Sequence, residues 1–462
     1  MSYNIPTPKG WQLVKLSDLG EVNRGKSKHR PRDADFLYGG KYPFIQTGDV
    51  KASGGRINSF NQTYSDEGLK QSRLWPEETM CITIAANIAE TGVLQFPACF
   101  PDSVIGFIAD KTKCDVYFIE YMFRLLKAKI KSQANGSVQD NINLQTLERI
   151  LFPIPNLADQ KKIAKILGVF DDKIIINNRL IETLEQMAQA LFKSWFVDFE
   201  PVKAKMAVLE VGGSQEDATF AAMTAISGKD ADALAVFERE HPEHYAELKA
   251  TAELFPSVMQ ESESGEIPDG WELKSFGDVS KCYDKKRIPL SKPQREKKKG
   301  EIPYYGATSI MDYVDEYIFD GIYLLLGEDG SVIKENGLPF TQYIWGKSWV
   351  NNHAHVLTGS GSVTTEHLMV FIKQENIAAY VTGAVQMKLN QKNMNSIPFI
   401  FADEAVNNVF GLRIDSIYAV IRAKSEENLT LTNLRDTLLP KLLSGEITLP
   451  EAEQAVSEAE NV

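Results

Sequence analysis

The residues from Gly20 to Ser27, GEVNRGKS, match the phosphate-binding pattern G-x-x-x-x-G-K-[ST]. In that pattern, backbone N–H groups cradle the phosphates of a nucleotide and the lysine neutralises their charge. Such a loop needs a strand before it and a helix directly after it, because the free N–H groups at the start of the helix hold the phosphates. The segment after Ser27 is KHRPRDAD, in which Pro31 argues against a helix. The local sequence therefore disfavours a nucleotide site and leaves Lys26 available for another phosphate.

The chain contains a tandem repeat that tests this interpretation. The segment PKGWQLVKLSDLGEV, which begins at Pro8, recurs 260 residues later as PDGWELKSFGDVSKC, beginning at Pro268. A later segment, NGSVQDNINLQTL from Asn135, recurs 247 residues on as TGAVQMKLNQKNM from Thr382. The change in offset shows that the second copy is shorter between these two landmarks. Self-similarity at a fixed offset indicates a duplication.

A basic run occupies the same point of each copy. RGKSKHRPR begins at Arg24 and KKRIPLSKPQREKKKG begins at Lys285. Gly20 and Gly25 correspond to Ser280 and Lys285, so in this interpretation the glycines are incidental and positive charge is the shared feature. Lysine and arginine in such loops suit a DNA phosphate backbone, and the alternative is a solvated run of charge. The residues predicted to contact phosphates are Arg24, Lys26, Lys28, Arg30, Arg32, Lys285, Lys286, Arg287, Lys297 and Lys298.

Other polar side chains could read base edges or hold a metal ion. His353 and His355 alternate along a strand pattern and could face one metal, but no third ligand lies nearby in the sequence, so no metal site is predicted. Asparagine and glutamine can pair with adenine, although they also serve turns and helix caps. The candidates for base or groove contact are Gln139, Asn143, Asn352, His353, Gln386 and Asn390. No arrangement of residues typical of catalysis is present in the sequence, so the chain is predicted to be non-catalytic.

The charge is unevenly distributed along the chain. The formal net charge is −12, but the segment from Met206 to Glu266 holds 13 acidic and 3 basic residues, and the segment from Glu446 to Val462 holds 5 acidic and none basic. The remainder carries a net charge of +3, so basic patches are possible there. The four cysteines form no C-x-x-C motif and no long apolar run occurs. These features predict a cytoplasmic protein without disulfides or a membrane segment.

Two segments have the apolar spacing of long helices. Apolar residues recur at intervals of four and three from Asp159 to Phe196, which predicts a helix of roughly 57 Å. A similar pattern runs from Ala402 to about Ser444, with a polar interruption between Lys424 and Asn428. Two such helices related by a pseudo-two-fold axis pair in antiparallel fashion, and the alternative is that each packs on its own domain. The residues predicted to pair the helices are Ile163, Leu167, Phe170, Ile174, Asn177, Ile181, Leu184, Phe410, Ile414, Ile417, Ile421, Leu431 and Leu438.

Each long helix follows a segment rich in short strand-like runs, such as MCITIA and VIGFIA in the first copy and IYLLLG and HAHVLTG in the second. These runs are rich in β-branched and aromatic residues and are broken by glycine, asparagine and proline. The predicted fold class is therefore α+β. It is a tandem pseudo-two-fold repeat of a strand-rich domain plus a long helix, with the two helices paired as an antiparallel coiled coil.

Five stretches of the chain carry a family likeness: PxGWxLxxLxDLGEV, GSVQDNINLQTLERILFPIPNLADQKKIAKIL, FKSWFVDFEPVKAKM, SGEIPDGWELKSFGDV and LRDTLLPKLLSGEI. With them, nearly the whole chain resembles the specificity subunit of type I restriction–modification enzymes. The resemblance implies target-recognition domains at 1–156 and 267–400, each reading one half of a bipartite, asymmetric DNA sequence. It makes the long helices, at 157–200 and 401–446, a ruler that fixes the spacing of the halves. The segments 201–266 and 447–462 are then an acidic helical linker and an acidic tail.

The resemblance also implies partners and cofactors. The partners are double-stranded DNA, two modification (methyltransferase) subunits and two restriction (ATP-dependent nuclease and translocase) subunits. S-adenosylmethionine, ATP and Mg²⁺ are expected in those subunits, and no cofactor is expected in this chain. The residues alone leave a second hypothesis open, a coiled-coil scaffold whose basic loops bind acidic protein partners.

Overall fold

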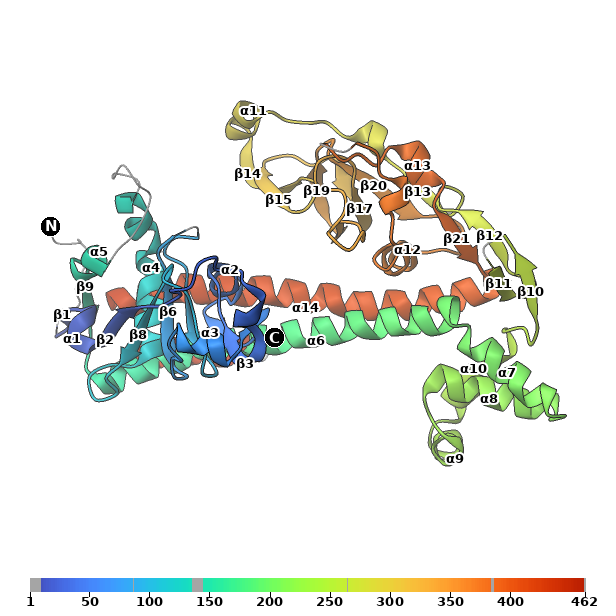
Figure 1. Cartoon of the computed structure of the whole chain (residues 1–462), viewed down its shortest axis with the longest axis horizontal. Helices are drawn as coiled ribbons and strands as arrows, with labels where there is room; N and C mark the ends of the chain where they lie inside the picture. Colours follow the sequence, from blue (N-terminus) through green and yellow to red (C-terminus); the bar gives the residue numbers. More distant parts are fainter. Residues whose placement is uncertain (1–9, 86, 135–143, 264, 384–385, 461–462) are drawn as a thin grey trace. The chain divides into compact units, whose positions relative to one another are not determined.

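The computed structural model describes residues 10–85, 87–134, 144–263, 265–383 and 386–460. The chain divides into two compact units, the first made of residues 1–178 and 425–462 and the second of residues 179–424. Each unit contains one strand-rich domain and part of each long helix (Figure 1).

The first unit begins with the strands and helices β1 (Gln12–Lys15), α1 (Leu16–Leu19), β2 (Gly20–Arg24), η1 (Asp35–Leu37), β3 (Tyr38–Phe44), α2 (Thr47–Ala52), β4 (Arg56–Ile57), β5 (Gln62–Tyr64), α3 (Asp66–Lys70), β6 (Thr79–Thr83), β7 (Thr91–Leu94), β8 (Val104–Ala109), α4 (Val116–Ala134), α5 (Leu144–Glu148) and β9 (Leu151–Ile154). It also holds the start of α6 (Leu157–Phe192), the end of α14 (Glu404–Ser444) and α15 (Leu449–Glu460).

The second unit holds the rest of α6 and α14 and the elements η2 (Lys193–Val197), α7 (Glu200–Glu210), α8 (Gln215–Ser227), α9 (Ala231–Glu240), α10 (Pro242–Glu253), β10 (Met259–Ser262), β11 (Gly265–Pro268), β12 (Glu272–Ser275), β13 (Ser280–Cys282), η3 (Asp284–Lys286), α11 (Lys292–Lys297), β14 (Lys299–Tyr305), β15 (Ile310–Val314), β16 (Phe319–Asp320), β17 (Tyr323–Gly327), β18 (Thr341–Ile344), β19 (Lys347–Val350), β20 (Ala354–Gly359), α12 (Thr365–Ile372), η4 (Ala378–Tyr380), α13 (Gln391–Asn395) and β21 (Pro398–Phe401).

The strand order repeats from one unit to the other. The first has a sheet in the order β2-β8-β6-β7-β4, and the second has one in the order β13-β20-β17-β18. In both, the strand that follows the N-terminal repeat motif pairs with a strand that precedes a helix, α4 or α12. The outer pairs β1–β9 and β12–β21 also correspond. The duplication predicted from the sequence is therefore present in the fold, and the α+β class is confirmed.

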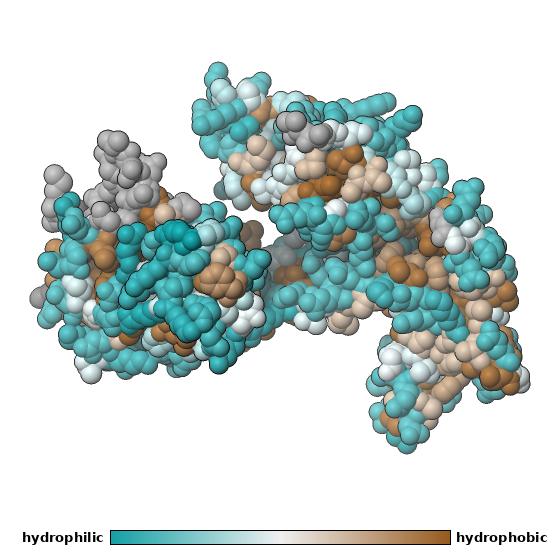
Figure 2. All heavy atoms as spheres, viewed as in Figure 1, coloured by the Kyte–Doolittle hydropathy of each residue, from teal (hydrophilic) through white to brown (hydrophobic). Residues whose placement is uncertain are grey.

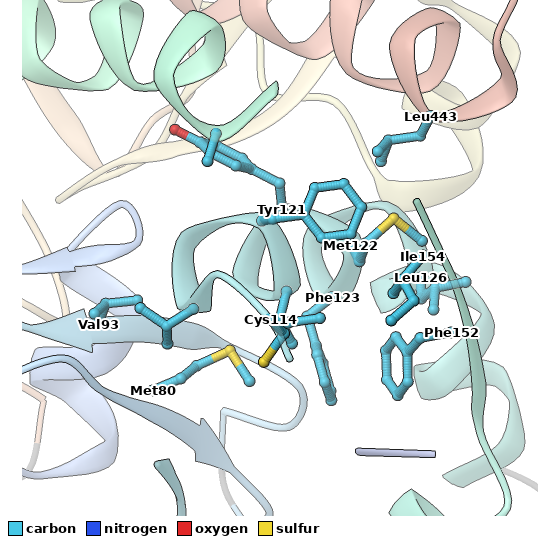
Figure 3. Packing of buried hydrophobic residues seen from close by; sticks show 14 of the residues in the cluster. Met80, Val93, Cys114, Tyr121, Met122, Phe123, Leu126, Phe152, Ile154 and Leu443 are labelled. Atoms are coloured by element: carbon cyan, nitrogen blue, oxygen red, sulfur yellow. The ribbon is translucent and has the colours of Figure 1, made fainter. Parts of the chain in front are cut away.

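Strand β6 shows how the sequence forms the core of the first unit. All five of its residues are buried, and successive side chains of a strand point to opposite faces. Met80 and Ile82 pack with α4, α6 and α14 on one face, while Cys81 packs with Trp75 and other residues on the opposite face. Figure 3 shows the first of these clusters, with Tyr121 and Met122 projecting from α4.

The two long helices pack against each other within each unit. In the first unit Ile163 and Phe170 share a core with Leu442, so the start of α6 meets the end of α14. In the second unit Phe192 shares a core with Phe410, so the end of α6 meets the start of α14. The two helices therefore run in opposite directions.

Both predicted alternatives for these helices hold in part, because each helix half also packs on a strand-rich domain. All thirteen residues predicted to pair the helices are buried or lie against these cores. They are Ile163, Leu167, Phe170, Ile174, Asn177, Ile181, Leu184, Phe410, Ile414, Ile417, Ile421, Leu431 and Leu438. The compact units consequently cut through α6 and α14, whereas the domain boundaries predicted from the sequence lie at residues 156 and 400.

A hydrogen-bonded pair of asparagines explains the interruption in the second apolar pattern. Asn177 fills the gap in the first pattern, and its amide Nδ2 donates to Oδ1 of Asn428 at 3.0 Å. The Nδ2 of Asn428 donates in turn to Oδ1 of Asn178 at 2.8 Å. The polar break of one helix therefore meets the polar gap of the other. Asn177 is buried and Asn428 is half-buried, and the two amides meet in only one register, so the pair helps to set the alignment of the helices.

A buried cluster of charges joins the first domain to both long helices. Asp171 of α6 lies 3.2 Å from the Arg124 guanidinium of α4 and 2.6 Å from that of Arg435 in α14. The Tyr121 hydroxyl, which points toward α6 in Figure 3, donates to Asp171 at 2.6 Å, and Arg56 lies 3.9 Å from the same carboxylate. Since buried charges are costly unless they are paired, Asp171 holds these three arginines in place.

The acidic segment predicted as a linker is a small helical subdomain of the second unit. Helices α8 to α10 share a core of their own, which includes Met223, Leu234 and Leu248, whereas Val202 of α7 belongs to the main core of the second unit. Lys205 of α7 is buried and donates from Nζ to the carbonyl of Phe255 at 2.5 Å. Over the residues that the structure describes, no helix is long and apolar enough to cross a membrane. Hydrophilic side chains cover most of the face seen in Figure 2.

Candidate nucleic-acid interface

The first basic loop leaves the sheet at the end of β2. The Gly25 N–H donates to the Val104 carbonyl at 2.8 Å, and the Lys26 N–H donates to the Phe100 carbonyl at 3.1 Å. These bonds hold the loop backbone against the start of β8 and the segment before it, while the side chains of Lys26 and Lys28 are exposed. No helix begins directly after Ser27, since the next helical turn is η1 at Asp35–Leu37, so the loop lacks the helix start that a nucleotide phosphate would require.

The two glycines of GEVNRGKS are required by packing, so the interpretation that they are incidental is wrong. A Cβ at Gly25 would lie 2.3 Å from the Pro101 carbonyl oxygen, and one at Gly20 would lie 2.1 Å from that of Ile108. Both distances are far below van der Waals contact with backbone atoms that cannot move easily. The glycines allow strand and loop to approach closely.

Replacing Gly25 with alanine is expected to lower the free energy of unfolding by about 1–3 kcal/mol, because the new methyl group forces the backbone apart. Urea denaturation measures this loss. Gly48→Ala is the matched control, since a Cβ there meets no atom within 4 Å and no loss of stability is expected. Equal stability of the Gly25 and Gly48 variants would contradict the packing role.

The arginines of this loop hold it together, in contrast to the lysines. Arg24 donates from Nε to the Asp102 carbonyl at 2.9 Å, and Arg32 pairs with the Asp102 carboxylate at 2.7 Å. Arg30 donates to the Ser27 carbonyl at 2.7 Å. All three arginines are exposed, but part of their hydrogen-bonding capacity is used within the domain.

In the second domain, η3 carries the corresponding charges. Lys285 and Lys286 are exposed, and the Lys286 ammonium lies 5.3 Å from the centre of the Tyr283 ring. Arg287 differs, because its side chain is only 10% exposed and pairs with Asp284 at 3.3 Å and with Glu328 at 2.7 Å. Its charge is taken up inside the domain, so a phosphate contact by Arg287 is not supported by its surroundings.

The two remaining candidates of the second basic run lie at the end of α11. Lys297 is exposed, whereas Lys298 donates to the Glu316 carboxylate at 2.7 Å. The nearby Asp312 accepts hydrogen bonds from Lys299, the Tyr313 N–H and Arg295. These bonds, of which that from Lys299 has the largest effect, lower the pKa of Asp312 to about 2. This carboxylate therefore fixes part of the basic run to β15.

His355 is a buried structural residue. Its Nδ1 lies 2.5 Å from Asp284 and its Nε2 lies 2.8 Å from the Leu389 carbonyl. Burial raises the pKa of Asp284, but the hydrogen bond with His355 and the other contacts outweigh it and the pKa lies below its ordinary value. Cys282, Asp284 and His355 place ligand-type atoms within 4.8 Å of one another. Because both ring nitrogens already face oxygen atoms and Arg287 supplies positive charge, this cluster is satisfied as a hydrogen-bonded network.

The predicted base-contact residues of the second domain lie around this network. His353 is half exposed and its Nδ1 lies 2.7 Å from Asp329, whereas Asn352 and Gln386 are exposed. Asn390 instead caps α13 by accepting from the Asn393 N–H at 2.9 Å. Asp329, the partner of His353, pairs through its backbone with Lys388, two residues from Gln386, whereas Asn390 has a structural role. Gln139 and Asn143 lie outside the described residues.

A hollow that no sequence motif predicts lies beside the first basic loop. It has a volume of about 680 Å³, and segments of the first domain that are far apart in the sequence line it. Arg32, Tyr38, Gln46, Gln62 and Ser103 contribute to its wall. Only the pairing of β3 with β5 brings Gln46 and Gln62 together, so no local motif could have identified this site.

The chain carries two similar domains, each with exposed lysines at the corresponding point. Each domain packs on the two long helices, which run in opposite directions. The chain matches the Type I restriction modification DNA specificity domain family over residues 8–186 and 268–405, which is more than half of its length. The chain belongs to this family, and its function is DNA sequence recognition through two domains in a type I restriction–modification system.

Two relatives known from their sequences agree with this assignment. The chain is 29% identical over 377 residues to the type I restriction enzyme HindI specificity subunit of Haemophilus influenzae, a match that covers 74% of this chain and 80% of that protein. It is 24% identical over 479 residues to the MjaIX specificity subunit of Methanocaldococcus jannaschii, covering 96% and 95%. Among solved structures, a type I restriction–modification S subunit from M. genitalium aligns over 96% of this chain and 99% of its own, at 16% identity and a TM-score of 0.46.

Proposed function

We propose that this chain is the non-catalytic specificity subunit of a type I restriction–modification complex, and that it reads a bipartite, asymmetric DNA target. Each strand-rich domain reads one half of the target. The observation that carries the proposal is the presence of an exposed lysine pair, Lys26 with Lys28 and Lys285 with Lys286, at the corresponding point of the two domains. The domains differ in sequence around these pairs, so the two halves of the target differ as well.

The long helices serve in this proposal as the ruler between the halves. Pairing of α6 with α14 is fixed by buried apolar side chains and by the Asn177–Asn428 contact. A rigid connection of this kind sets one unread spacer length, since half-site spacing follows from the geometry of the protein.

Catalysis belongs to partner subunits in this proposal. Two modification subunits bind S-adenosylmethionine and methylate the target, and two restriction subunits consume ATP with Mg²⁺. The family resemblance supports these partners and cofactors. The specificity chain itself binds no cofactor, and the complex acts in the cytoplasm.

A salt titration tests the phosphate contacts. The change is alanine at Lys26, Lys28, Lys285 and Lys286, assayed in the complex with modification subunits. The slope of log K against log[salt] is negative, and each lost phosphate contact reduces its magnitude by about 0.9. The magnitude is therefore expected to fall by about three to four, and all duplexes are expected to bind more weakly.

The control replaces the exposed lysines Lys111, Lys161, Lys162 and Lys203, which changes the net charge equally. This control is expected to keep most of the wild-type slope. Equal slopes for the wild type and the first variant would contradict the assignment of the loops. A wild-type complex that shifts no duplex DNA would instead favour the scaffold hypothesis.

A further inference from the structure

Two glutamines form a hydrogen-bonded pair at the hollow beside the first basic loop. Gln46 lies between β3 and α2, Gln62 begins β5, and both line the hollow. The Nε2 of Gln46 donates to Oε1 of Gln62 at 2.6 Å. Both side chains are exposed, so the pair faces solvent and is accessible to a ligand.

The surroundings fix the orientation of this pair. The Gln46 N–H donates to Oδ2 of Asp49 at 2.7 Å, and its side chain faces the Asp49 N–H in a capping box at the start of α2. The other carboxylate oxygen of Asp49 accepts from Nδ2 of Asn61 at 2.6 Å, which ties the turn before β5 to the same residue. Asp49 therefore holds both glutamine-bearing segments, and the amides are preorganised.

The pair presents adjacent hydrogen-bonding groups of opposite kind. An amide oxygen has two acceptor sites and an amide nitrogen two donors, so Oε1 of Gln46 can still accept and Nε2 of Gln62 can still donate. In the major groove, adenine offers the N6 amino group as a donor and N7 as an acceptor side by side. Guanine offers two acceptors there, so it leaves the free amide oxygen without a partner. The pair thus complements adenine.

The charges around the hollow favour a base edge over a phosphate. Arg32, which also lines the hollow, is paired with Asp102, whereas the carboxylates Asp33 and Asp35 in the wall would repel a phosphate. Ser27 also lines the hollow and lies between the exposed Lys26 and Lys28. Exposed lysines on either side of a lining residue, with amides in the wall, match the division between contacts that position DNA and contacts that read sequence.

The second domain carries no glutamine at the two corresponding positions, both of which the structure describes. At the offset of 260 residues that relates the two copies, Gln46 corresponds to Gly306. Tyr42 pairs with Tyr64 in the first domain, and its counterpart Ile302 pairs with Val314 in the second, so Tyr64 corresponds to Val314. Gln62, two residues before Tyr64, therefore corresponds to Asp312. Asp312 is bound to Arg295 and Lys299. The first domain therefore has a free donor and a free acceptor at these two positions, and the second domain does not.

We propose that the Gln46–Gln62 pair reads an adenine in the half of the target bound by the first domain. This inference rests on the proposed function and adds to it the residues and the base. It also explains in part why the two halves differ, since Gly306 and Asp312 cannot reproduce the pair.

Sequencing of methylated DNA tests the proposal. Wild type, Gln62→Ala and the double variant Gln46→Ala/Gln62→Ala are each expressed with the modification subunit in a host, and the methylated motif is derived from the whole genome. At one A·T position of one half-site, the preference for adenine is expected to fall roughly 5- to 150-fold, the equivalent of a lost bidentate base contact. The other half-site is expected to stay unchanged.

Two controls separate this inference from the proposed function. Gln12→Ala changes an exposed glutamine of the same domain that does not line the hollow, and Tyr313→Ala changes an exposed residue of β15 in the second domain. Neither is expected to alter the position affected by the glutamine variants. If the double variant methylates the same motif as the wild type at every position, the inference is overturned but the proposed function stands. The same holds if the variant loses its base preference at a G·C position instead. The absence of any motif for the wild type would overturn the proposed function.

Discussion

Replacing Asp171 with alanine is expected to lower the free energy of unfolding of the first unit by about 3–5 kcal/mol. The carboxylate is buried among Arg56, Arg124 and Arg435, and its removal leaves Glu120 as the acidic partner of this cluster, bonded to Arg124. Uncompensated guanidinium groups in a buried site carry most of this cost, because the energy of desolvating them is no longer offset. Urea denaturation gives the size of the loss.

Hydrogen exchange locates the effect of this change. Faster exchange is expected in α4 and in the start of α6, with little change in β20 and α12 of the second unit. Asp172→Ala is the matched control, because Asp172 is exposed on the same turn of α6, and a change within about 0.5 kcal/mol is expected. Similar losses for Asp171 and Asp172 variants would show that the arginines need no buried partner.

The same cluster predicts a pH dependence. Burial raises the pKa of Asp171, but Arg124 and Arg435, helped by the Tyr121 hydroxyl and Arg56, outweigh burial and the pKa lies below its ordinary value. A carboxylate with a depressed folded-state pKa contributes stability above its unfolded-state pKa of about 4, and that contribution is lost as the pH falls through the folded-state value. Denaturation of Asp171→Asn should therefore depend less on pH below about 4 than that of the wild type.

Replacing Phe410 with alanine is expected to cost the second unit about 3–5 kcal/mol. Phe410 is fully buried near the start of α14, and its ring centre lies 4.8 Å from that of Phe196 and 4.6 Å from that of His367. Burial lowers the pKa of His367 to about 3, so this ring is a neutral packing partner. The change opens a cavity where α6, α12 and α14 meet.

Leu412→Ala is the matched control for Phe410→Ala, because Leu412 lies half a turn away on α14 and is 69% exposed. Its loss is expected to change stability by less than about 0.5 kcal/mol in the isolated chain. Chemical denaturation and hydrogen exchange of α12 measure both variants. Equal effects at the two positions would contradict the packing of the second domain on the long helices.

Much of the fold follows from local sequence patterns. The apolar runs MCITIA and HAHVLTG overlap β6 and β20. The helix predicted from Asp159 to Phe196 corresponds to α6, which gives way to a π-helical turn after Phe192. The meaning of the polar interruption near Asn428 could not be read from the chain. Its hydrogen-bond partner Asn177 is 251 residues away, and only the paired helices bring the two together.

The two basic loops of the candidate site could be predicted, because a run of lysine and arginine is visible in the sequence itself. Sequence alone identified both basic loops, but it could not tell which charges are used internally. Arg287 pairs with Glu328 and Arg32 with Asp102, and these partners are distant in the sequence. The Gln46–Gln62 pair was missed for the same reason, since the two residues meet through the β3–β5 pairing.

Mapping of methylated bases in a host that expresses this chain with its modification subunit tests the central claim most directly. The predicted result is a single bipartite motif whose two halves differ and are separated by one fixed spacer. A variable spacer, two identical halves or the absence of any methylated motif would contradict recognition by two different domains held at a fixed distance.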